Sequence, residues 1–201
     1  DWGSGEKYVL NQYYNRLPSQ VFINNNEQKQ ISEVNLYNLP DEENKVKLIW
    51  NYTITNCVNM FKDLSDILSI NFDKFDTSSV TEMNGMFMGC TSLASLDLTS
   101  FDSKNVNNMI DMFNRCSSLK SINFDNFSTS SCTKMSAMFY GCSSLKSINL
   151  DNFDISKVIS MESIFMECTS LTSLDLKSFN TKSVVIMSNM FNNCNSLTFL
   201  D

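Results

Sequence analysis

Seven cysteines are the side chains of this sequence best suited to chemistry, because thiolates bind metals, form disulfides and attack electrophiles. Zinc sites pair cysteines roughly two to four residues apart. Here Cys57 takes the place of a methionine and Cys132 that of a valine, and the other five recur every 26 residues at an apolar position: Cys90, Cys116, Cys142, Cys168 and Cys194. We interpret all seven as buried free thiols. Disulfides between neighbouring repeats are the alternative, and we expect no metal site.

The carboxylates are the next candidates for chemistry. Asp97, Asp175 and Asp201 share one repeat position, but Asn123 and Asn149 occupy it between them. Histidine is absent, which removes the commonest general base and every Ser-His or Cys-His nucleophile. No glycine-bearing calcium loop accompanies the acids. We therefore predict no catalytic residue, no cofactor and no enzyme activity, and interpret the acids as part of a solvated polar face.

Ten of the twelve methionines fall at two repeat positions, which include Met83, Met109 and Met135. A redox-active or copper-binding methionine cluster is one interpretation. Core packing is the interpretation we favour, because these positions lie on the stripe that a helix would have to bury.

All of these side chains recur within a 26-residue repeat. A repeat of this length determines the whole fold. One position of the repeat is always phenylalanine: Phe61, Phe87, Phe113, Phe139, Phe165 and Phe191. Thirteen of the fifteen phenylalanines occupy such phased positions. A unit that recurs so regularly indicates a stack of similar units.

The unit from Val80 to Phe101 changes its period halfway. Apolar residues from Val80 to Cys90 fall within one helical stripe, and Ser79 with Glu82 has the spacing of a capping box. The following Leu-x-x-Leu-x-Leu segment alternates at period two, which indicates a short strand. The sequence thus predicts an α/β solenoid: a right-handed coil with one short helix per repeat on the convex side and a parallel concave sheet. Its six strands would be centred near residues 70, 96, 122, 148, 174 and 200.

The string V-x-x-M-x-x-M-F-x-x-C-x-S-L-x-S-L-D-L-x-x-F resembles leucine-rich repeats, and within them the 26-residue repeat of the BspA-like family of surface proteins. The match covers about residues 54 to 201. The resemblance implies a leucine-rich-repeat fold and a role as an adhesin or binding module at a cell surface. It implies no catalytic residues.

Residues 1–53 lack the repeat and hold both tryptophans, so we interpret them as a capping region for the array at 54–201. Strands are expected at Gln20–Ile23 and Lys45–Trp50, and a helix at about Lys7–Arg16. An aromatic partner site is the alternative. At the other end the pattern leaves an open edge at Leu197, Phe199 and Leu200, which predicts a longer chain or a partner there.

These features lead to one functional expectation with an alternative. We expect a non-enzymatic leucine-rich-repeat binding and adhesion module of a secreted or surface protein, which contacts a protein or glycan through the concave face: Ser95, Asp97, Ser121, Asn123, Ser147, Asn149, Ser173 and Asp175. The alternative is a structural brace that docks through its amino-terminal cap and its open carboxyl-terminal edge.

The net charge and the hydropathy of the sequence argue against nucleic acid as a partner and against a membrane-spanning segment. The net charge of −7, without a basic block, disfavours nucleic acid, and no apolar run is long enough to span a membrane. Asn51 and Asn126 begin glycosylation triplets, which matter only if the chain enters a eukaryotic secretory route.

Overall fold

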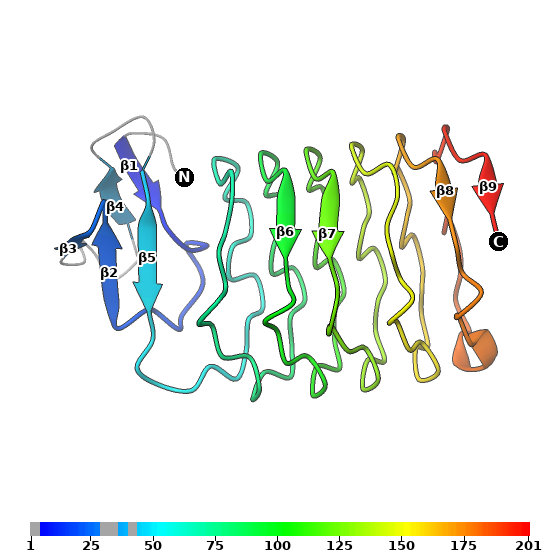
Figure 1. Ribbon diagram of the computed structural model, residues 1–201, viewed down its shortest axis with the longest axis horizontal. Coiled ribbons are helices and arrows are strands. Elements are labelled where there is room, and N and C mark those ends of the chain that lie inside the picture. The colour runs from blue at the N-terminus through cyan, green and yellow to red at the C-terminus, as the bar shows by residue number, and fades with distance from the viewer. Residues whose placement is uncertain (1–4, 29–35, 40–43) are drawn as a thin grey trace.

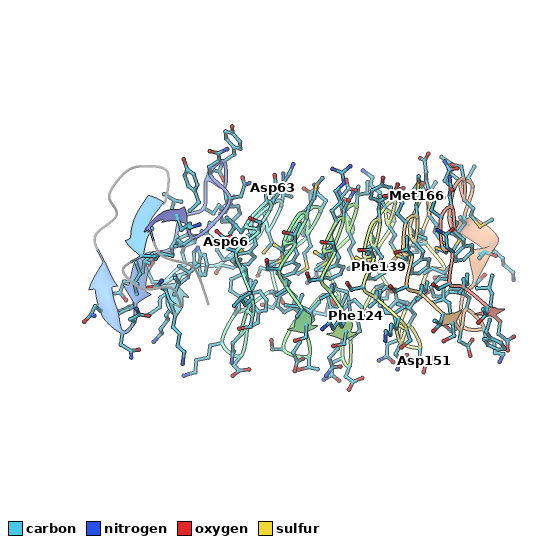
Figure 2. The ribbon with its side chains drawn as sticks, turned by 90° about the horizontal axis from the view of Figure 1, so that it is seen from above. Asp63, Asp66, Phe124, Phe139, Asp151 and Met166 are labelled. Carbon is cyan, nitrogen blue, oxygen red and sulfur yellow. The ribbon has the colours of Figure 1, made fainter. Side chains whose placement is uncertain are left out.

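The computed structural model describes residues 5–28, 36–39 and 44–201. The described chain has two parts (Figure 1): an amino-terminal region of short antiparallel strands and a row of similar units that extends from it to the opposite end of the molecule. Each unit of the row corresponds to one 26-residue repeat. The row keeps one direction in the perpendicular views of Figures 1 and 2, without the horseshoe curve expected of a concave sheet.

The amino-terminal region contains two small sheets. Strand β1 (Gly5–Tyr8) pairs antiparallel with β4 (Leu36–Leu39). Strand β2 (Gln20–Ile23) lies between β3 (Asn26–Gln28) and β5 (Val46–Ile49), antiparallel to both. Strands β2 and β5 lie where the sequence predicts strands.

The helix expected at Lys7–Arg16 does not form. Its first residues belong to β1, and the rest are turns. The Tyr14 side chain is buried against the first unit of the row. Burial of single side chains in a turn, rather than of one helical stripe, therefore explains the apolar residues of this segment.

The predicted α/β solenoid is wrong. The described residues contain no α-helix, only the 3-10 helix η1 (Thr181–Ser183), and their sheets have only two or three strands each. On the strand side, β6 (Ser95–Asp97) pairs in parallel with β7 (Ser121–Asn123), and β8 (Ser173–Leu174) pairs with β9 (Phe199–Leu200). The strands expected near residues 70 and 148 do not form, so the six-stranded concave sheet is replaced by two separate pairs.

Successive tight turns take the place of the expected helix. In the segment Val80–Cys90, the Met86 N–H donates to the Met83 carbonyl (3.2 Å) and the Cys90 N–H to the Phe87 carbonyl (3.1 Å). These bonds span three residues, whereas an α-helix needs bonds that span four. Apolar residues three apart are buried equally well by such turns, which is why the period alone is misleading.

Left-handed residues interrupt the backbone twice in every unit. Gly85 has φ of 63° and Gly89 has φ of 74°, a conformation that glycine adopts without strain. An α-helix cannot continue through such a residue. The same two positions have positive φ in the other units, mostly without glycine: Asn59, Asp63, Asp111, Arg115, Ala137, Gly141, Ser163, Glu167, Asn189 and Asn193.

Hydrogen bonds between units hold the row together on the side formed by these turn segments. The alternate N–H groups of Met83, Gly85 and Phe87 donate to carbonyls of the next unit, at 2.8–3.0 Å. The same pattern runs from the first unit, where Cys57 donates to Glu82, to the last described unit, where isolated parallel bridges link Ser160 to Ile186. The N–H groups that would donate hydrogen bonds within a helix therefore donate them to the neighbouring unit.

The core of the row is a column of stacked phenylalanine rings. Adjacent rings from Phe61 to Phe191 have centroids 5.5–5.9 Å apart and planes within 9° of each other. Figure 2 places Phe139, and Phe124 of a second aromatic cluster, between the margins of the row, while Asp63, Asp151 and Met166 lie toward its edges. The chain segments that carry these rings are positioned by burial rather than by secondary structure.

Candidate functional site

The predicted polar side chains lie on the strand side of the row. In the β6–β7 pair, Ser95 lies opposite Ser121 and Asp97 opposite Asn123, and all four are exposed. The structure therefore brings these four residues together as one patch. These four residues and their equivalents in the next two units form what we call the polar face. The equivalents are Ser147, Asn149, Ser173 and Asp175. Of these, Ser173 is half-buried and the others are exposed.

A shallow hollow lies on the polar face over β6, β7 and the unpaired segment of the following unit. Its volume is about 390 Å³, and its polar lining includes Ser121, Asn123, Asn149 and Asn152. Asn152 and Asp125, which also line it, are not part of the sequence prediction. They follow the predicted column within the same turn, so their recurring polar character is the signal that could have identified them.

Each Asp or Asn of the polar face closes the turn that follows it. The Asp97 carboxylate accepts the Thr99 N–H (3.0 Å), and the Asn149 amide oxygen accepts the Asp151 N–H (2.9 Å). The N–H and hydroxyl of Thr99 hold the pKa of Asp97 below its usual value. One side-chain oxygen of every such residue is thus held by a backbone N–H. The other side-chain atom, an amide nitrogen or a second carboxylate oxygen, is left for other contacts. A face fixed in this way suits binding better than proton transfer.

A lysine joins the acids at the carboxyl-terminal end of the face. The Lys177 ammonium lies 3.7 Å from the Asp175 carboxylate and contacts the carboxylate of Asp201. The hydrogen bond to Asp201 and the charges of both acids raise the pKa of Lys177. Because this pair is exposed to solvent, it stabilises the fold little.

A second series of turn-closing acids was missed from the sequence. Asp76, Asp102 and Asp154 accept the N–H two residues further on. Hydrogen bonds from the side chains of Ser78, Lys104 and Ser156, together with those N–H groups, hold the pKa of each carboxyl below its usual value. Asp76 and Asp102 are 26 residues apart and Asp154 lies two repeats further on, with Ser128 at the intervening position. Asp102 and Asp154 follow Asp97 and Asn149 of the polar face by five residues, so this series closes the next turn along the chain.

The cysteines are free thiols that lie mostly in the core. All seven are free, and six are buried. The thiols of the regular column donate to the phenylalanine carbonyl of the preceding unit, for example Cys116 to Phe87 at 3.0 Å and Cys142 to Phe113 at 3.2 Å. In residues 5–28, 36–39 and 44–201, no group of three or more His, Cys, Asp or Glu side chains could hold a metal ion.

Burial keeps these thiols protonated. It raises the pKa of Cys57, Cys116 and Cys168 to about 12 and that of Cys132 to about 11. A thiolate is the reactive form, so these groups are poor nucleophiles at neutral pH. The methionines Met83, Met109 and Met135 are likewise fully buried, as core residues are.

A second hollow, not foreseen from the sequence, lies between the amino-terminal region and the first unit. Its volume is about 510 Å³, and its lining includes Tyr8, Asn11, Tyr13, Arg16 and Lys62. The Tyr13 ring is 83% exposed beside it. The clustering of tyrosines before residue 15 is the signal that accompanies this hollow in the sequence.

The remaining predicted residues lie at the surface. Phe199 and Leu200 in β9 are 55% and 50% exposed, and Leu197 is half-buried. Asn51 is exposed and its side chain contacts the Ser19 hydroxyl, and Asn126 is exposed in a left-handed turn. No helix in the described part of the chain has the length and apolar character that crossing a membrane requires.

Comparison with known proteins identifies the family from the repeat itself. The family model described as "Mycoplasma protein of unknown function, DUF285" matches three overlapping stretches, residues 37–124, 55–149 and 119–199. The chain belongs to the DUF285 family. The successive matches of the DUF285 model agree with the repeated unit seen in the structure. No curated protein and no solved structure matches the chain.

Proposed function

We propose that this DUF285 protein is a non-enzymatic binding and adhesion module of a surface-displayed or secreted protein, which contacts a protein or a glycan through the polar face. The observation that carries the proposal is a row of Ser, Asn and Asp side chains. Ser95 and Asp97 lie in register with Ser121 and Asn123, and the Asp or Asn of each of the four units closes its own turn. A face fixed in this way loses little conformational freedom when a partner binds.

The composition of the polar face indicates the kind of contact. Ser121, Asn123 and Asn149 offer short hydroxyl and amide groups around the hollow, which suit hydrogen bonds to sugar hydroxyls or to a polypeptide backbone. The large anchors of strong interfaces, Trp, Tyr and Arg, do not line it. We therefore expect weak single contacts. The net charge of −7 makes nucleic acid an unsuitable partner.

The sequence resemblance to BspA-like repeats supports the surface location and the adhesive role. It rests on the phased Met-Phe pair, the cysteine and the Leu-x-x-Leu-x-Leu segment of each unit. We infer from it that the protein acts outside the cell or at its surface.

The test compares two triple variants of equal charge. The first variant, which we call the Ser95 series, carries Ser95→Lys, Ser121→Lys and Ser147→Lys. It alters the polar face and leaves every turn-closing Asn and Asp in place. The second variant, which we call the Thr81 series, carries Thr81→Lys, Asn107→Lys and Ile159→Lys. It alters three exposed residues that share a different position of the repeat. Binding is measured for the immobilised full chain against a panel of defined oligosaccharides and purified surface proteins.

We expect the wild-type chain and the Thr81 series to bind the same members of the panel. The Ser95 series should lose that binding at least tenfold, a cost of about 1.4 kcal/mol. Equal loss in both series would contradict the proposal, as would a wild-type chain that binds no member of the panel.

A second candidate function is a structural brace within a larger assembly. The exposed Tyr13 ring beside the hollow of the amino-terminal region favours it, because the brace would dock through that region. In that case the Ser95 series would leave assembly unchanged.

A further inference from the structure

Backbone carbonyls at every second residue line one side of each unit. In the second unit they accept N–H groups of the first unit at 2.7–3.0 Å, and they belong to Glu82, Asn84, Met86 and Met88. The equivalent carbonyls of the first unit lie beside the amino-terminal region and belong to Asn56, Val58, Met60 and Lys62. The groups that satisfy these four carbonyls therefore show how the amino-terminal region fits the row.

Two residues of the amino-terminal region cover three of the four carbonyls. The Tyr14 hydroxyl donates to the Asn56 carbonyl at 3.0 Å. The N–H and the side-chain amide of Asn11 donate to the carbonyls of Met60 (2.8 Å) and Lys62 (2.9 Å). These contacts replace the donors that a preceding unit would supply.

The fourth carbonyl, that of Val58, is left open. No group among the described residues donates a hydrogen bond to it. The equivalent carbonyl accepts an N–H in each of the other five units, at 2.8–3.1 Å: Asn84, Ile110, Ser136, Glu162 and Ser188. Within the described part of the chain, the Val58 carbonyl is therefore the acceptor of this series that a bound molecule can engage.

Val58 lines the hollow between the amino-terminal region and the first unit, which we call the junction hollow. Its volume of about 510 Å³ lies within the range of small-ligand sites. Figure 2 labels Asp63, another lining residue, where the row meets the amino-terminal region. A molecule that fills this hollow should therefore carry a hydroxyl or N–H group for the Val58 carbonyl.

The charges of the junction hollow favour an anion. Arg16 is exposed and Lys62 is half-buried, and neither forms an ion pair with a described residue. Asp63 is the only acid among the described lining residues, and one of its carboxylate oxygens packs closely against Gly89 of the second unit. Two cations in a chain of net charge −7 attract a negative group, and a guanidinium matches the geometry of a carboxylate. The nearby Asp63 disfavours the second negative charge of a phosphate.

Hydrogen bonds fix the backbone beside the hollow. The Trp50 indole N–H donates to the Arg16 carbonyl (2.9 Å), which holds the residue that carries the guanidinium. The Tyr13 N–H donates to the Asn11 side-chain oxygen (3.0 Å), and the Tyr13 ring is 83% exposed. A ring that is exposed on a fixed turn offers an apolar face that can pack against the C–H groups of a sugar.

We propose that the junction hollow binds a sugar that carries a carboxylate, such as a uronic acid unit of a glycan. Arg16 and Lys62 contact the carboxylate. A sugar hydroxyl donates to the Val58 carbonyl, and the Tyr13 ring packs against the C–H face of the sugar. The junction hollow and the hollow of the polar face share no lining residue, so this proposal does not depend on the function proposed for the polar face.

The amide side chains of the lining favour a sugar over a peptide. Gln12, Asn15 and Asn59 line the junction hollow, and each amide both donates and accepts hydrogen bonds. A sugar presents several hydroxyls of the same dual character on one small ring. An extended peptide spreads its N–H and C=O groups over about 3.3 Å per residue, which suits a compact hollow less well.

The test uses three probes and the full chain. Methyl glucuronide and methyl glucoside differ only in a carboxylate that replaces a CH₂OH group. N-acetylglycine carries a carboxylate and a peptide N–H but no hydroxyls. Each probe is titrated into the isotope-labelled chain, and NMR follows the backbone resonances, including that of the Val58 carbonyl carbon.

Three variants identify the site. Arg16→Gln removes the guanidinium of the hollow. Its matched control is Arg115→Gln, which removes the other arginine of the chain, an exposed residue of the third unit. Tyr13→Ala removes the exposed ring. Denaturation curves establish that the variants fold, and Lys62→Gln replaces Arg16→Gln if that variant does not.

We expect methyl glucuronide to bind the wild-type chain with a dissociation constant of about 1 mM, as for a small ligand with few contacts. Methyl glucoside and N-acetylglycine should bind at least tenfold more weakly. Arg16→Gln should weaken the binding of methyl glucuronide about tenfold and Tyr13→Ala about threefold. Arg115→Gln and the Ser95 series should bind it like wild type. The carbonyl resonance of Val58 should shift on binding, and that of Ile110 should not.

Four outcomes would overturn the proposal. The first is a wild-type chain that does not bind methyl glucuronide, and the second is equal weakening by Arg16→Gln and Arg115→Gln. The third is a neutral glucoside or N-acetylglycine that binds as tightly as the glucuronide, because the ligand would then need no carboxylate or would be a peptide. The fourth is a Val58 carbonyl resonance that stays in place while the glucuronide binds, because the sugar would then lie elsewhere.

Discussion

The rings of Phe113 and Phe139 lie parallel, with centroids 5.5 Å apart and an angle of 9° between their planes. The two residues occupy the same position of neighbouring repeats, and both are fully buried. Cys142 of the second unit donates to the Phe113 carbonyl, so the ring and the backbone of Phe113 are both held by the next unit. A single position of the repeat thus joins one unit to the next through packing and hydrogen bonding together.

Truncation of a central ring should therefore destabilise the whole row. We expect Phe113→Ala to lower the free energy of unfolding by about 3–5 kcal/mol, as for large buried aromatics. Tyr13→Ala, which removes an exposed ring, should change it by less than about 0.5 kcal/mol. Urea denaturation followed by circular dichroism measures both. Similar values for the two variants would show that the stack contributes little.

The left-handed position of Ala137 provides a test of the turn geometry. Ala137 has φ of 55°, which costs a residue with a Cβ about 1–2 kcal/mol. We expect Ala137→Gly to stabilise the protein by about 0.5–1 kcal/mol, because glycine adopts this φ freely and loses part of the gain to its more flexible unfolded state.

Ala94→Gly is the matched control for that change. Ala94 is not among the residues of positive φ, so glycine there should destabilise the protein by about 0.5–1 kcal/mol. Denaturation midpoints that shift in opposite directions support the turn geometry. A loss of stability in both variants would favour a helical conformation around Ala137.

Sequence reasoning found the repeated unit and its buried positions but not its backbone. The phased burial of Phe87, Cys90 and Leu93 could be predicted because each is apolar in every unit. The helix could not be excluded, because apolar residues three and four apart suit both a helix and a series of turns. Gly85 and Gly89 were the available signals of left-handed turns, but other units place Ala, Ser or charged residues at those positions.

The same reasoning located the polar face but missed what its side chains do. Exposed Asp97 and Asn123 follow from alternation along a strand, and the structure places them side by side. That each also closes its own turn depends on the backbone two residues further on, which the pattern of apolar residues does not determine. The hollow extends over β6, β7 and Asn149 of the following unit, and no residue type in the repeat marks where the strand pairing stops.

The Tyr14 hydroxyl provides a test of how the amino-terminal region covers the first unit of the row. It donates to the Asn56 carbonyl at 3.0 Å from a buried side chain. We expect Tyr14→Phe to destabilise the protein by about 1 kcal/mol, because the carbonyl loses its donor while the ring is kept. Tyr13→Phe alters a hydroxyl on a ring that is exposed and should leave stability unchanged. Amide hydrogen exchange should show the loss first in residues 54–64, and a uniform change along the row would contradict a local capping role.

The buried thiols make the stability of the protein depend on alkaline pH. Burial raises the pKa of Cys116 to about 12 and that of Cys132 to about 11, whereas a thiol in the unfolded chain has a pKa of about 8.5. Below about pH 8.5 these thiols are protonated in both states and do not make stability depend on pH. Above it, the unfolded chain loses protons that the folded chain keeps, so the free energy of unfolding falls until the folded thiols ionise as well.

Cys132→Val isolates one of these thiols, because valine occupies the equivalent position in four other units, at Val80, Val106, Val158 and Val184. Between about pH 9 and pH 10.5, we expect the free energy of unfolding of the wild-type chain to fall more steeply than that of the variant, by about 1.4 kcal/mol per pH unit. Urea denaturation at several pH values, with a reductant present, measures the two slopes. All other titrating groups are shared by the two proteins, so the difference reports Cys132 alone. Equal slopes would mean that the Cys132 thiol ionises in the folded protein as it does in the unfolded chain, and that it is not enclosed as the structure shows.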